Sequence, residues 1–319
     1  MQKIIDKIKY FQVSFFNRPL LNALNLLPNN GNITLCDVGA AGEIEPRWRP
    51  YKKKLNYIGF EPDKRSREKI LNKKKDFKEY KILPFALANE HKTTNLFLCR
   101  KPRVSSLYEP NLNFLERFPN PKRFDVMQTE QMQCVTLDSI DLPKVDFLKI
   151  DIQGAENDVI KGASSKLELA FGLEVEVEFL ELYKRQPLFG DVCSQLSDLG
   201  FEFFDFINLG RWERDIFSGH GQCIYADAIF FRTPESLIKR NMDVDSWSSY
   251  FSVLLIYNRF DLIYTSLSLL PTNIKDAFKE FKKALEKARK RDAFIRRTSS
   301  AFNRIISLTG SNYRIHLIR

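Results

Sequence analysis

Between residues 33 and 232, short apolar stretches alternate with longer charged stretches of helical character. The apolar stretches are Ile33–Val38, Tyr57–Phe60, Lys81–Ala86, Val145–Ile150, Gly172–Phe179, Phe201–Ile207 and Tyr225–Phe231. We expect each to form a strand, with helices between most of them, at residues 64–75, 155–168 and 188–199. Such alternation is typical of a mostly parallel sheet with helices on both faces. The pattern therefore predicts an α/β fold with a doubly wound, Rossmann-like sheet.

The segments on either side of this region have a helical pattern instead. Apolar side chains recur every three or four positions before Pro19 and again after Arg232. We therefore divide the chain into an N-terminal helical extension (1–30), a central domain (31–234) and a small, basic, helical C-terminal appendage (235–319).

Composition is that of an ordinary globular protein, with 44% hydrophobic and 28% charged residues. The five cysteines are scattered and form no C-x-x-C pair, which favours buried thiols over a disulfide framework or a zinc site. The N-terminus has no signal-peptide pattern, and no apolar run reaches the roughly 20 residues that span a membrane. These features predict a cytoplasmic protein.

Most of the net charge of +10 lies near the C-terminus. Residues 271–319 carry 13 Lys and Arg but only 4 Asp and Glu. A predicted basic helix at 273–296 has an apolar side formed by Phe278, Phe281, Leu285 and Ala288. Such a helix packs on the rest of the protein or on another subunit, or it lies on an anionic membrane surface. We expect packing, together with weak attraction to the inner surface of the cell membrane.

Two segments predict a crevice for an adenosine-containing ligand. The strand Ile33–Val38 ends in a turn of small residues, Gly39 to Gly42, which lets a ligand approach the backbone. The next strand ends in Glu61, where a doubly wound fold places an acid on ribose hydroxyls. A simple turn, and a helix cap at Glu61, are the alternatives. The turn lacks G-x-G-x-x-G spacing and the chain has no Walker A sequence, so S-adenosylmethionine is favoured over NAD or ATP.

A third apolar strand, Val145–Ile150, ends in Asp151 and is followed by a glycine and a helix. Ligands of doubly wound folds bind beyond the carboxyl ends of the strands, so we expect Asp151 to share the crevice with Gly39. The alternative is that Asp151 caps helix 155–168. The candidate cofactor-binding residues are Asp37, Gly39, Ala40, Gly42, Glu61, Asp63 and Asp151.

Seven segments resemble, in order, the motifs of FkbM-type S-adenosylmethionine-dependent methyltransferases. They are DVGAAGEI, IGFEPD, SSLYEPN, FLKIDIQGAENDVIKGA, LEVEVEF, LYKRQPLF and YADAIFFR. The resemblance implies a Rossmann-like methyltransferase sheet, S-adenosylmethionine as donor, and methylation of a hydroxyl group, often on a sugar or a polyketide. It places Asp37, Gly39, Glu61 and Asp151 on the family's cofactor motifs.

The sequence departs from the family pattern at two points. Many members read DVGANxG, whereas here Ala41 replaces Asn and Gly42 comes one residue earlier. The shorter loop leaves open which group contacts the methionine carboxylate. The commoner V-E-G is replaced by Ile152-Gln153-Gly154. Some related O-methyltransferases use Mg²⁺, but no spacing in this sequence indicates a metal site.

Methyl transfer to a hydroxyl requires a positioned acceptor and a group that takes its proton. Glu174, Glu176 and Glu178 alternate with apolar residues, so they share one face of a strand. Burying them is costly unless they are paired or face a ligand, and mutual repulsion raises a carboxyl pKa. The alternative is a set of glutamates that faces the edge of the sheet or is paired with Arg or Lys. We take Asp151, Glu176 and Glu178 as catalytic candidates, with Glu178 nearest the end of the strand.

The fourth catalytic candidate is His220, in a glycine-containing loop before the last strand. Simple solvent exposure is the alternative for this histidine.

Together these features predict an O-methyltransferase that acts on a sugar hydroxyl of a glycan or glycan precursor. Only the resemblance motivates the sugar. The alternatives are methylation of a polyketide, a lipid or an RNA, and a non-catalytic module that binds nucleic acid or membrane through the basic tail. The motifs do not resemble those of rRNA or tRNA methyltransferases, which makes nucleic acid the less favoured partner. Homo-oligomerisation is left open.

Overall fold

The structure, a computed structural model, describes residues 22–71, 73–74, 76–215, 221–288 and 290. These belong to two compact units. Residues Asn32–Leu269 form the central unit, and the chain up to Gly31 and from Leu270 onward forms the other. The strands described here all lie in the central unit. The predicted helix at 1–30 falls mostly outside the described residues.

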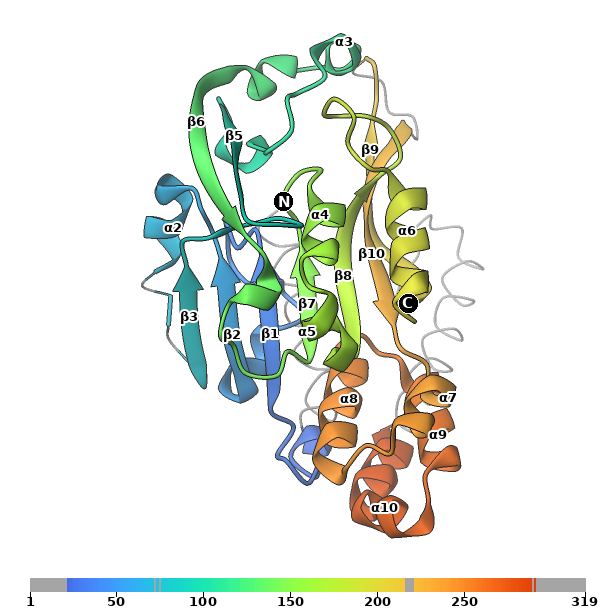
Figure 1. The fold of residues 1–319 in the computed structure, drawn as a ribbon. Helices are drawn as coiled ribbons and strands as arrows, with labels where there is room; N and C mark the ends of the chain where they lie inside the picture. The colour runs from blue at the N-terminus through green and yellow to red at the C-terminus, as the bar shows by residue number, and fades with distance from the viewer. Residues whose placement is uncertain (1–21, 72, 75, 216–220, 289, 291–319) are drawn as a thin grey trace, which may run out of the picture. The chain divides into compact units, whose positions relative to one another are not determined.

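The central unit is built on a seven-stranded sheet in the order β3-β2-β1-β7-β8-β10-β9 (Figure 1). Its strands are β1 (Ile33–Val38), β2 (Leu55–Phe60), β3 (Glu79–Leu83), β7 (Phe147–Ile150), β8 (Gly172–Glu178), β9 (Glu202–Trp212) and β10 (Gln222–Phe231). Strands β3, β2, β1, β7 and β8 are parallel, and β10 is antiparallel to both of its neighbours. The strand order reverses between β1 and β7, as in a doubly wound sheet. The predicted fold class is therefore confirmed.

Alternate side chains of the central strands face different layers. Leu148 of β7 and Val175 of β8 belong to a core that includes Val159 and Leu196. This core is covered by α4 (Glu156–Lys161), α5 (Ser164–Leu169) and α6 (Phe189–Asp198). Phe147 points the other way, where its ring centroid lies 4.9 Å from that of Tyr257 at the end of α8 (Val244–Ile256). The chain thus has apolar layers on both faces of the sheet.

The remaining helical elements are short. They are η1 (Arg49–Lys54), α2 (Lys64–Ile70), η2 (Pro102–Val104), α3 (Leu112–Leu115), η3 (Pro121–Phe124), η4 (Leu137–Ser139), α7 (Pro234–Leu237), η5 (Ile238–Arg240) and α9 (Phe260–Leu269). The single helix predicted at 155–168 is divided into α4 and α5 around Gly162. A Cβ at this glycine would lie 2.0 Å from the carbonyl oxygen of Ala88, so the chain here packs directly against another backbone segment.

A second sheet, which the sequence pattern did not predict, lies beyond one end of the main sheet (Figure 1). It contains β4 (Ala86–Leu87), β5 (Lys92–Cys99) and β6 (Val126–Val135) in the order β4-β6-β5. We call residues 86–135 the cap. Phe114, Phe124 and other cap residues pack against Tyr183 and Ile224 of the main body. Most of β6 is exposed, so its sequence lacks the alternating apolar pattern of a half-buried strand.

The other unit contains α10 (Thr272–Ala277), followed by a turn at Phe278 and further helix over residues 279–288. The continuous helix predicted from 273 is therefore interrupted, and residues 291–296 fall outside the described range. Phe278, Phe281 and Leu285 of the predicted apolar side are buried. No helix in the described residues is long and apolar enough to cross a membrane. Attraction to a membrane surface stays a prediction.

Candidate active site

A cavity of about 410 Å³ lies between the carboxyl ends of β1, β7 and β8 and the cap. Its volume falls within the range of about 300–1,000 Å³ that is common for small-molecule sites. The main body contributes acidic side chains, namely Asp37, Glu43, Glu45, Asp151, Glu176 and Glu178. The cap contributes the cations Lys101, Arg103 and Arg123. The sequence predicted a crevice at this end of the strands but did not indicate the basic wall of the cavity.

The turn after β1 is fixed between two neighbouring strands. The N–H groups of Gly39 and Ala40 both donate to the carbonyl of Phe60, each at 3.0 Å. Gly39 has a φ of +86°, and a Cβ there would lie 1.9 Å from the carbonyl oxygen of Asp151. Only glycine satisfies both constraints. The turn thus brings its backbone against the end of β7, where it lines the cavity.

Arg103 of the cap lies against the shortened part of this turn. A Cβ on Gly42 would be 3.2 Å from its Nη2 atom. Both residues line the cavity. The sequence left open which group lies near the methionine carboxylate at this shorter loop. The structure places the guanidinium of Arg103 beside the loop.

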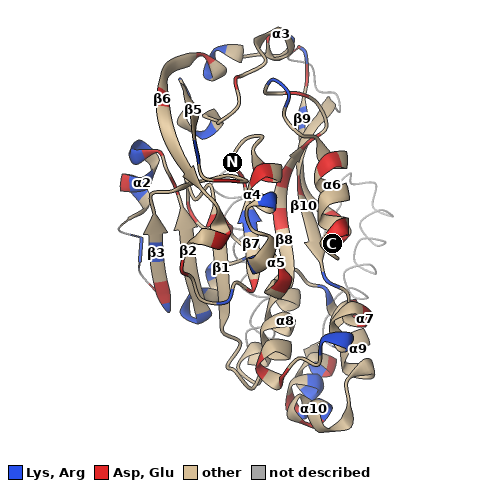
Figure 2. Cartoon of the chain, in the orientation of Figure 1, with Lys and Arg blue, Asp and Glu red and all other residues tan. Residues whose placement is uncertain are grey.

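A row of charged side chains crosses three neighbouring strands beneath the cavity. Asp37 of β1, Lys149 of β7 and Glu174 of β8 are paired in register. Lys149 is buried, and its Nζ lies 3.8 Å from Asp37 Oδ1 and 3.4 Å from Asp151 Oδ2. Burial opposes the charge on Lys149, but the surrounding carboxylates raise its pKa above the ordinary value. In Figure 2 the ribbon of β7 has a blue, basic segment, and the neighbouring strand β8 has red, acidic segments.

Asp37 is ion-paired with Lys149 through its Oδ1 atom, which accepts no hydrogen bond from the described residues. Its Oδ2 accepts a hydrogen bond of 2.7 Å from the Tyr57 hydroxyl. Its buried Oδ1 has no hydrogen-bond partner within the described part of the chain. A buried acceptor without a donor is uncommon in folded proteins. Because Asp37 lines the cavity, this oxygen is suited to a donor supplied by a ligand.

Asp151 and Glu176 form a carboxyl pair in the cavity. The side-chain amide of Gln153 donates to Asp151 Oδ1 at 3.1 Å and also to Glu176. Burial raises the pKa of Glu176 well above its ordinary value, and the negative charge of Asp151 raises it further. Burial also opposes ionisation of Asp151, but Lys149 and the neighbouring hydrogen bonds lower its pKa overall. Asp151 is therefore the ionised member of the pair.

The three glutamates predicted to share a face do so, but their surroundings differ. Glu174 lies 3.8 Å from Arg47 and accepts a hydrogen bond from the Tyr257 hydroxyl. Glu176 and Glu178 line the cavity instead. Burial, together with the charges of Glu156 and Asp151, raises the pKa of Glu178 well above its ordinary value. Pairing thus accounts for the first carboxylate, whereas the other two face the cavity.

The segment after Asp151 is locked by several hydrogen bonds. Gln153 and Gly154 both have positive φ angles, 65° and 106°. The Glu156 carboxylate accepts from the N–H groups of Ile152 and Gly154, at 2.9 and 2.8 Å. The Tyr183 hydroxyl lies 3.1 Å from Gln153 Oε1. Helix α4 begins after Ala155 without a side-chain cap, so the interpretation of Asp151 as a helix cap is wrong.

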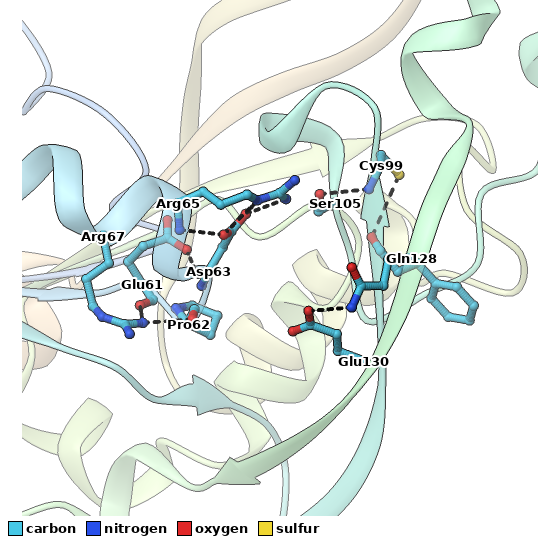
Figure 3. A network of polar contacts seen from close by, with 10 residues as sticks. Glu61, Pro62, Asp63, Arg65, Arg67, Cys99, Ser105, Gln128 and Glu130 are labelled. Carbon is cyan, nitrogen blue, oxygen red and sulfur yellow. Dashed lines mark hydrogen bonds and ion pairs between the residues drawn. The ribbon is translucent and has the colours of Figure 1, made fainter.

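Glu61 and Asp63 follow β2 and lie outside the lining of the cavity. Asp63 caps α2 by accepting from the Arg65 N–H, and Glu61 Oε1 accepts from the Asp63 N–H at 2.9 Å (Figure 3). Burial raises the pKa of Glu61 to about 7, against 4.5 for an ordinary glutamate. Asp63 is thus the N-terminal capping residue of helix α2. A role for Glu61 in binding a ribose stays a prediction.

The remaining candidate, His220, lies outside the described residues. Five charged or polar residues that line the cavity were not predicted from the sequence as site residues, namely Lys149, Gln153, Lys101, Arg103 and Arg123. Lys149 had a visible signal, because it is a single cation in an otherwise apolar strand. The cap cations had none, since their proximity to the turn at Gly39 depends on packing between distant segments. No cluster of three or more metal-ligating side chains with suitable geometry occurs in the described ranges.

A family model of the FkbM methyltransferase domain matches residues 37–203, which is more than half of the chain. The chain belongs to the FkbM methyltransferase family. The match begins at Asp37 and includes the small-residue turn, the cap and both cavity glutamates of β8. The resemblance deduced from the motifs is therefore confirmed, and with it the assignment to a methyltransferase family.

Two solved structures are similar to this FkbM chain. A methyltransferase FkbM from Methylobacillus flagellatus KT has 15% identity and a TM-score of 0.37; the similarity covers 63% of this chain but only 44% of that one. The magnesium protoporphyrin IX methyltransferase from Synechocystis PCC 6803, with bound SAM, has 12% identity and a TM-score of 0.35, over 73% of this chain and 79% of that one. A search of curated proteins gave no match.

We expect the two glycines of the FkbM turn to differ sharply in their tolerance of a methyl group. Gly39→Ala should lower the free energy of unfolding by about 1–3 kcal/mol from the backbone conformation alone, and more from the contact with Asp151. In Gly42→Ala the new Cβ meets only the far end of Arg103, so stability should change by less than about 1 kcal/mol. Urea denaturation monitored by circular dichroism measures both. Equal destabilisation would contradict the described turn.

A second prediction concerns the pH dependence of stability through Glu61. Its pKa is about 7 in the folded protein, against 4.5 ordinarily, so the folded state keeps the proton longer. The stability associated with this proton is fully present below pH 4.5 and is lost as pH rises through about 7. Glu61→Gln removes this loss. Its free energy of unfolding should therefore exceed that of the wild type by up to about 3 kcal/mol between pH 5 and pH 8.

Thermal unfolding of the ligand-free protein at several pH values tests this expectation. The matched control is Glu68→Gln on α2, whose side chain is exposed. Its difference from the wild type should stay constant with pH. A constant difference for Glu61→Gln as well would show that Glu61 ionises normally.

Proposed function

We propose that this chain transfers a methyl group from S-adenosylmethionine to a hydroxyl oxygen of a sugar, in a glycan or a glycan precursor. Family membership supports methyl transfer. The observation that carries the choice of a hydroxyl is that a single cavity contains both the small-residue turn after β1 and two carboxyl groups of β8 with raised pKa values. A donor site and a proton acceptor are thereby next to each other.

The residues around the turn fit S-adenosylmethionine. The turn from Gly39 to Gly42 lines the cavity with small residues only, and the buried Oδ1 of Asp37 accepts no hydrogen bond from the part of the chain that the structure describes. Arg103 against Gly42 is suited to the methionine carboxylate, and Glu61 at the end of β2 is suited to the ribose hydroxyls. When bound, the cofactor supplies an electrophilic methyl group on a positively charged sulfur.

Glu178 is the best placed group to take the proton of the acceptor hydroxyl. It is the last residue of β8, is nearly fully buried and lines the cavity. A carboxylate with a raised pKa is a stronger base than an exposed one once it has lost its proton. Asp151, held ionised by Lys149, keeps negative charge beside Glu176 and orients the shared Gln153 amide. These groups position the acceptor while the base acts.

Two aromatic side chains and several hydrogen-bonding groups support a sugar as acceptor. Trp212 and Tyr225 line the same cavity as the carboxyl groups. Sites for polar organic ligands commonly combine aromatic surfaces with a few polar groups that fix orientation. A sugar ring offers both an apolar C–H face and hydroxyls, so it matches this lining.

We expect methyl transfer to depend on Glu178. Incubation with methyl-labelled S-adenosylmethionine and a panel of nucleotide sugars and cell glycans should label a sugar hydroxyl. Glu178→Gln should lower kcat by about 100-fold or more and leave S-adenosylmethionine affinity, measured by calorimetry, within about threefold. Glu181→Gln, an exposed carboxyl in the next loop, is the matched control and should be fully active. A wild-type protein that does not bind S-adenosylmethionine would refute the proposed function.

The pH profile provides an independent check of the base. Glu178 has a raised pKa, so kcat of the wild type should rise with pH as this carboxyl loses its proton, and then level off. The residual activity of Glu178→Gln should lack that rise. If both proteins share the same profile, the proton is taken by another group.

We also expect Arg103 to contribute to cofactor affinity. Arg103→Gln removes the charge beside Gly42 and should weaken S-adenosylmethionine binding about tenfold, or about 1.4 kcal/mol. S-Adenosylhomocysteine, which has the same carboxylate, should be weakened equally. Adenosine alone should bind both proteins alike. If adenosine is weakened to the same extent, Arg103 supports the turn rather than the carboxylate.

A further inference from the structure

The cap side of the active-site cavity is unusually rich in cations. Lys101, Arg103 and Arg123 line this wall. Arg103 lies next to the turn, where the proposed cofactor role accounts for it. Lys101 and Arg123 have no role in the proposed transfer to a neutral sugar. Two cations at this position favour an acceptor that carries a negatively charged group.

Lys101 and Arg123 also line a second, more open cavity in the cap. Its other lining residues are Arg100, Pro102, Asn120, Pro121 and Lys122. Two of its cations, Lys101 and Arg123, thus belong to both linings. Four cations in all line the second cavity, namely Arg100, Lys101, Lys122 and Arg123.

Three of these cations are available to a ligand. Arg100 is paired with Asp125, with Nη2 at 3.0 Å from Oδ2. Within the described ranges, no carboxylate lies within ion-pair distance of Lys101, Lys122 or Arg123. Like charges that converge on a cavity repel each other, and an anion between them removes that repulsion.

Packing against aromatic rings holds Arg123 in place. The guanidinium of Arg123 lies over the ring of Trp212 at 4.6 Å from its centroid, and over Phe124 at 5.1 Å. The backbone N–H of Lys101 donates to the carbonyl of Arg123 at 3.1 Å. Stacking on aromatic rings limits the motion of a guanidinium and leaves its edge free for hydrogen bonds. The guanidinium of Arg123 is thus held in position before a ligand arrives, which lowers the entropy that this side chain loses on binding.

We propose that the acceptor is a sugar that carries a phosphate or diphosphate, with the anionic group between Lys101, Lys122 and Arg123 of the cap. This inference rests on the proposed function, because it specifies the substrate class of that same site. Phosphate oxygens accept several charge-assisted hydrogen bonds from arginine and lysine. The cations surround a cavity of small-molecule size instead of a broad convex face, which favours a phosphorylated sugar over a nucleic acid.

The test measures binding separately from methyl transfer. Calorimetry at fixed ionic strength compares inorganic pyrophosphate, UDP-glucose, a polyprenyl diphosphate sugar in detergent, and a neutral oligosaccharide. The wild type should bind pyrophosphate, and at least one diphosphate sugar should bind at least tenfold more tightly than the neutral oligosaccharide. Whichever binds more tightly, UDP-glucose or the polyprenyl diphosphate sugar, identifies the source of the diphosphate. Either result supports the proposal.

The variant Lys101→Ala/Arg123→Gln removes two charges and keeps a planar side chain on Trp212. It should bind pyrophosphate and the diphosphate sugar at least tenfold more weakly, with S-adenosylmethionine affinity within about twofold of the wild type. The matched control is Arg117→Gln, since Arg117 also stacks on a phenyl ring of the cap but lines neither cavity. It should bind all ligands as the wild type does.

Several outcomes would overturn the proposal. Unchanged pyrophosphate binding in the double variant is one, and preference for the neutral oligosaccharide is another. A short RNA that binds more tightly than every diphosphate sugar, and loses affinity in the same variant, would assign the cations to nucleic acid. Failure of the wild type to bind S-adenosylmethionine would refute the proposed function instead, and the binding of pyrophosphate does not depend on that result.

Discussion

The site depends on the ion pairs that the buried ammonium group of Lys149 makes with nearby carboxylates. Three carboxylates, those of Asp37, Asp151 and Glu174, surround it at the end of the parallel strands. Removing so many charges from water is expensive unless they compensate each other. The ion pairs of this lysine with Asp37 and Asp151 hold the two carboxyl groups close together at the cavity. Without it, the ends of β1 and β7 would repel each other.

Charge pairing also divides the three carboxyl groups of β8 into one that is paired and two that face the cavity. Glu174 is paired with Arg47, which comes from the loop after the small-residue turn, and with Tyr257, which follows α8. A helix from the C-terminal part of the chain thereby stabilises the floor of the site. Glu176 and Glu178 are beyond the reach of these partners and keep raised pKa values in the cavity. One strand thus carries a structural carboxylate and two that are suited to chemistry.

The cap converts an open crevice at the strand ends into a cavity with two electrostatic sides. Ser106 of the cap donates to the carbonyl of Gln153 at 2.6 Å, and the Tyr183 hydroxyl lies 3.0 Å from the carbonyl of Val104. These bonds join the cap to the segments after β7 and β8. An amide at position 153, where the family commonly has a glutamate, donates to the carboxyl pair and adds no further negative charge. The departure from the motif is therefore consistent with a site already rich in acids.

Local patterns determined the strands of the main sheet, the turn at Gly39 and the shared face of the three β8 glutamates. These features follow from side-chain periodicity and from the conformational freedom of glycine, which act over a few residues. Sequence could not decide whether Glu174 or Glu178 was paired, because Arg47 and Tyr257 lie far away along the chain. It also missed the cap, whose strand β6 is mostly exposed and has no buried alternation. The basic wall at Lys101 and Arg123 exists only because packing brings the cap over the strand ends, and such proximity is a property of the tertiary structure alone.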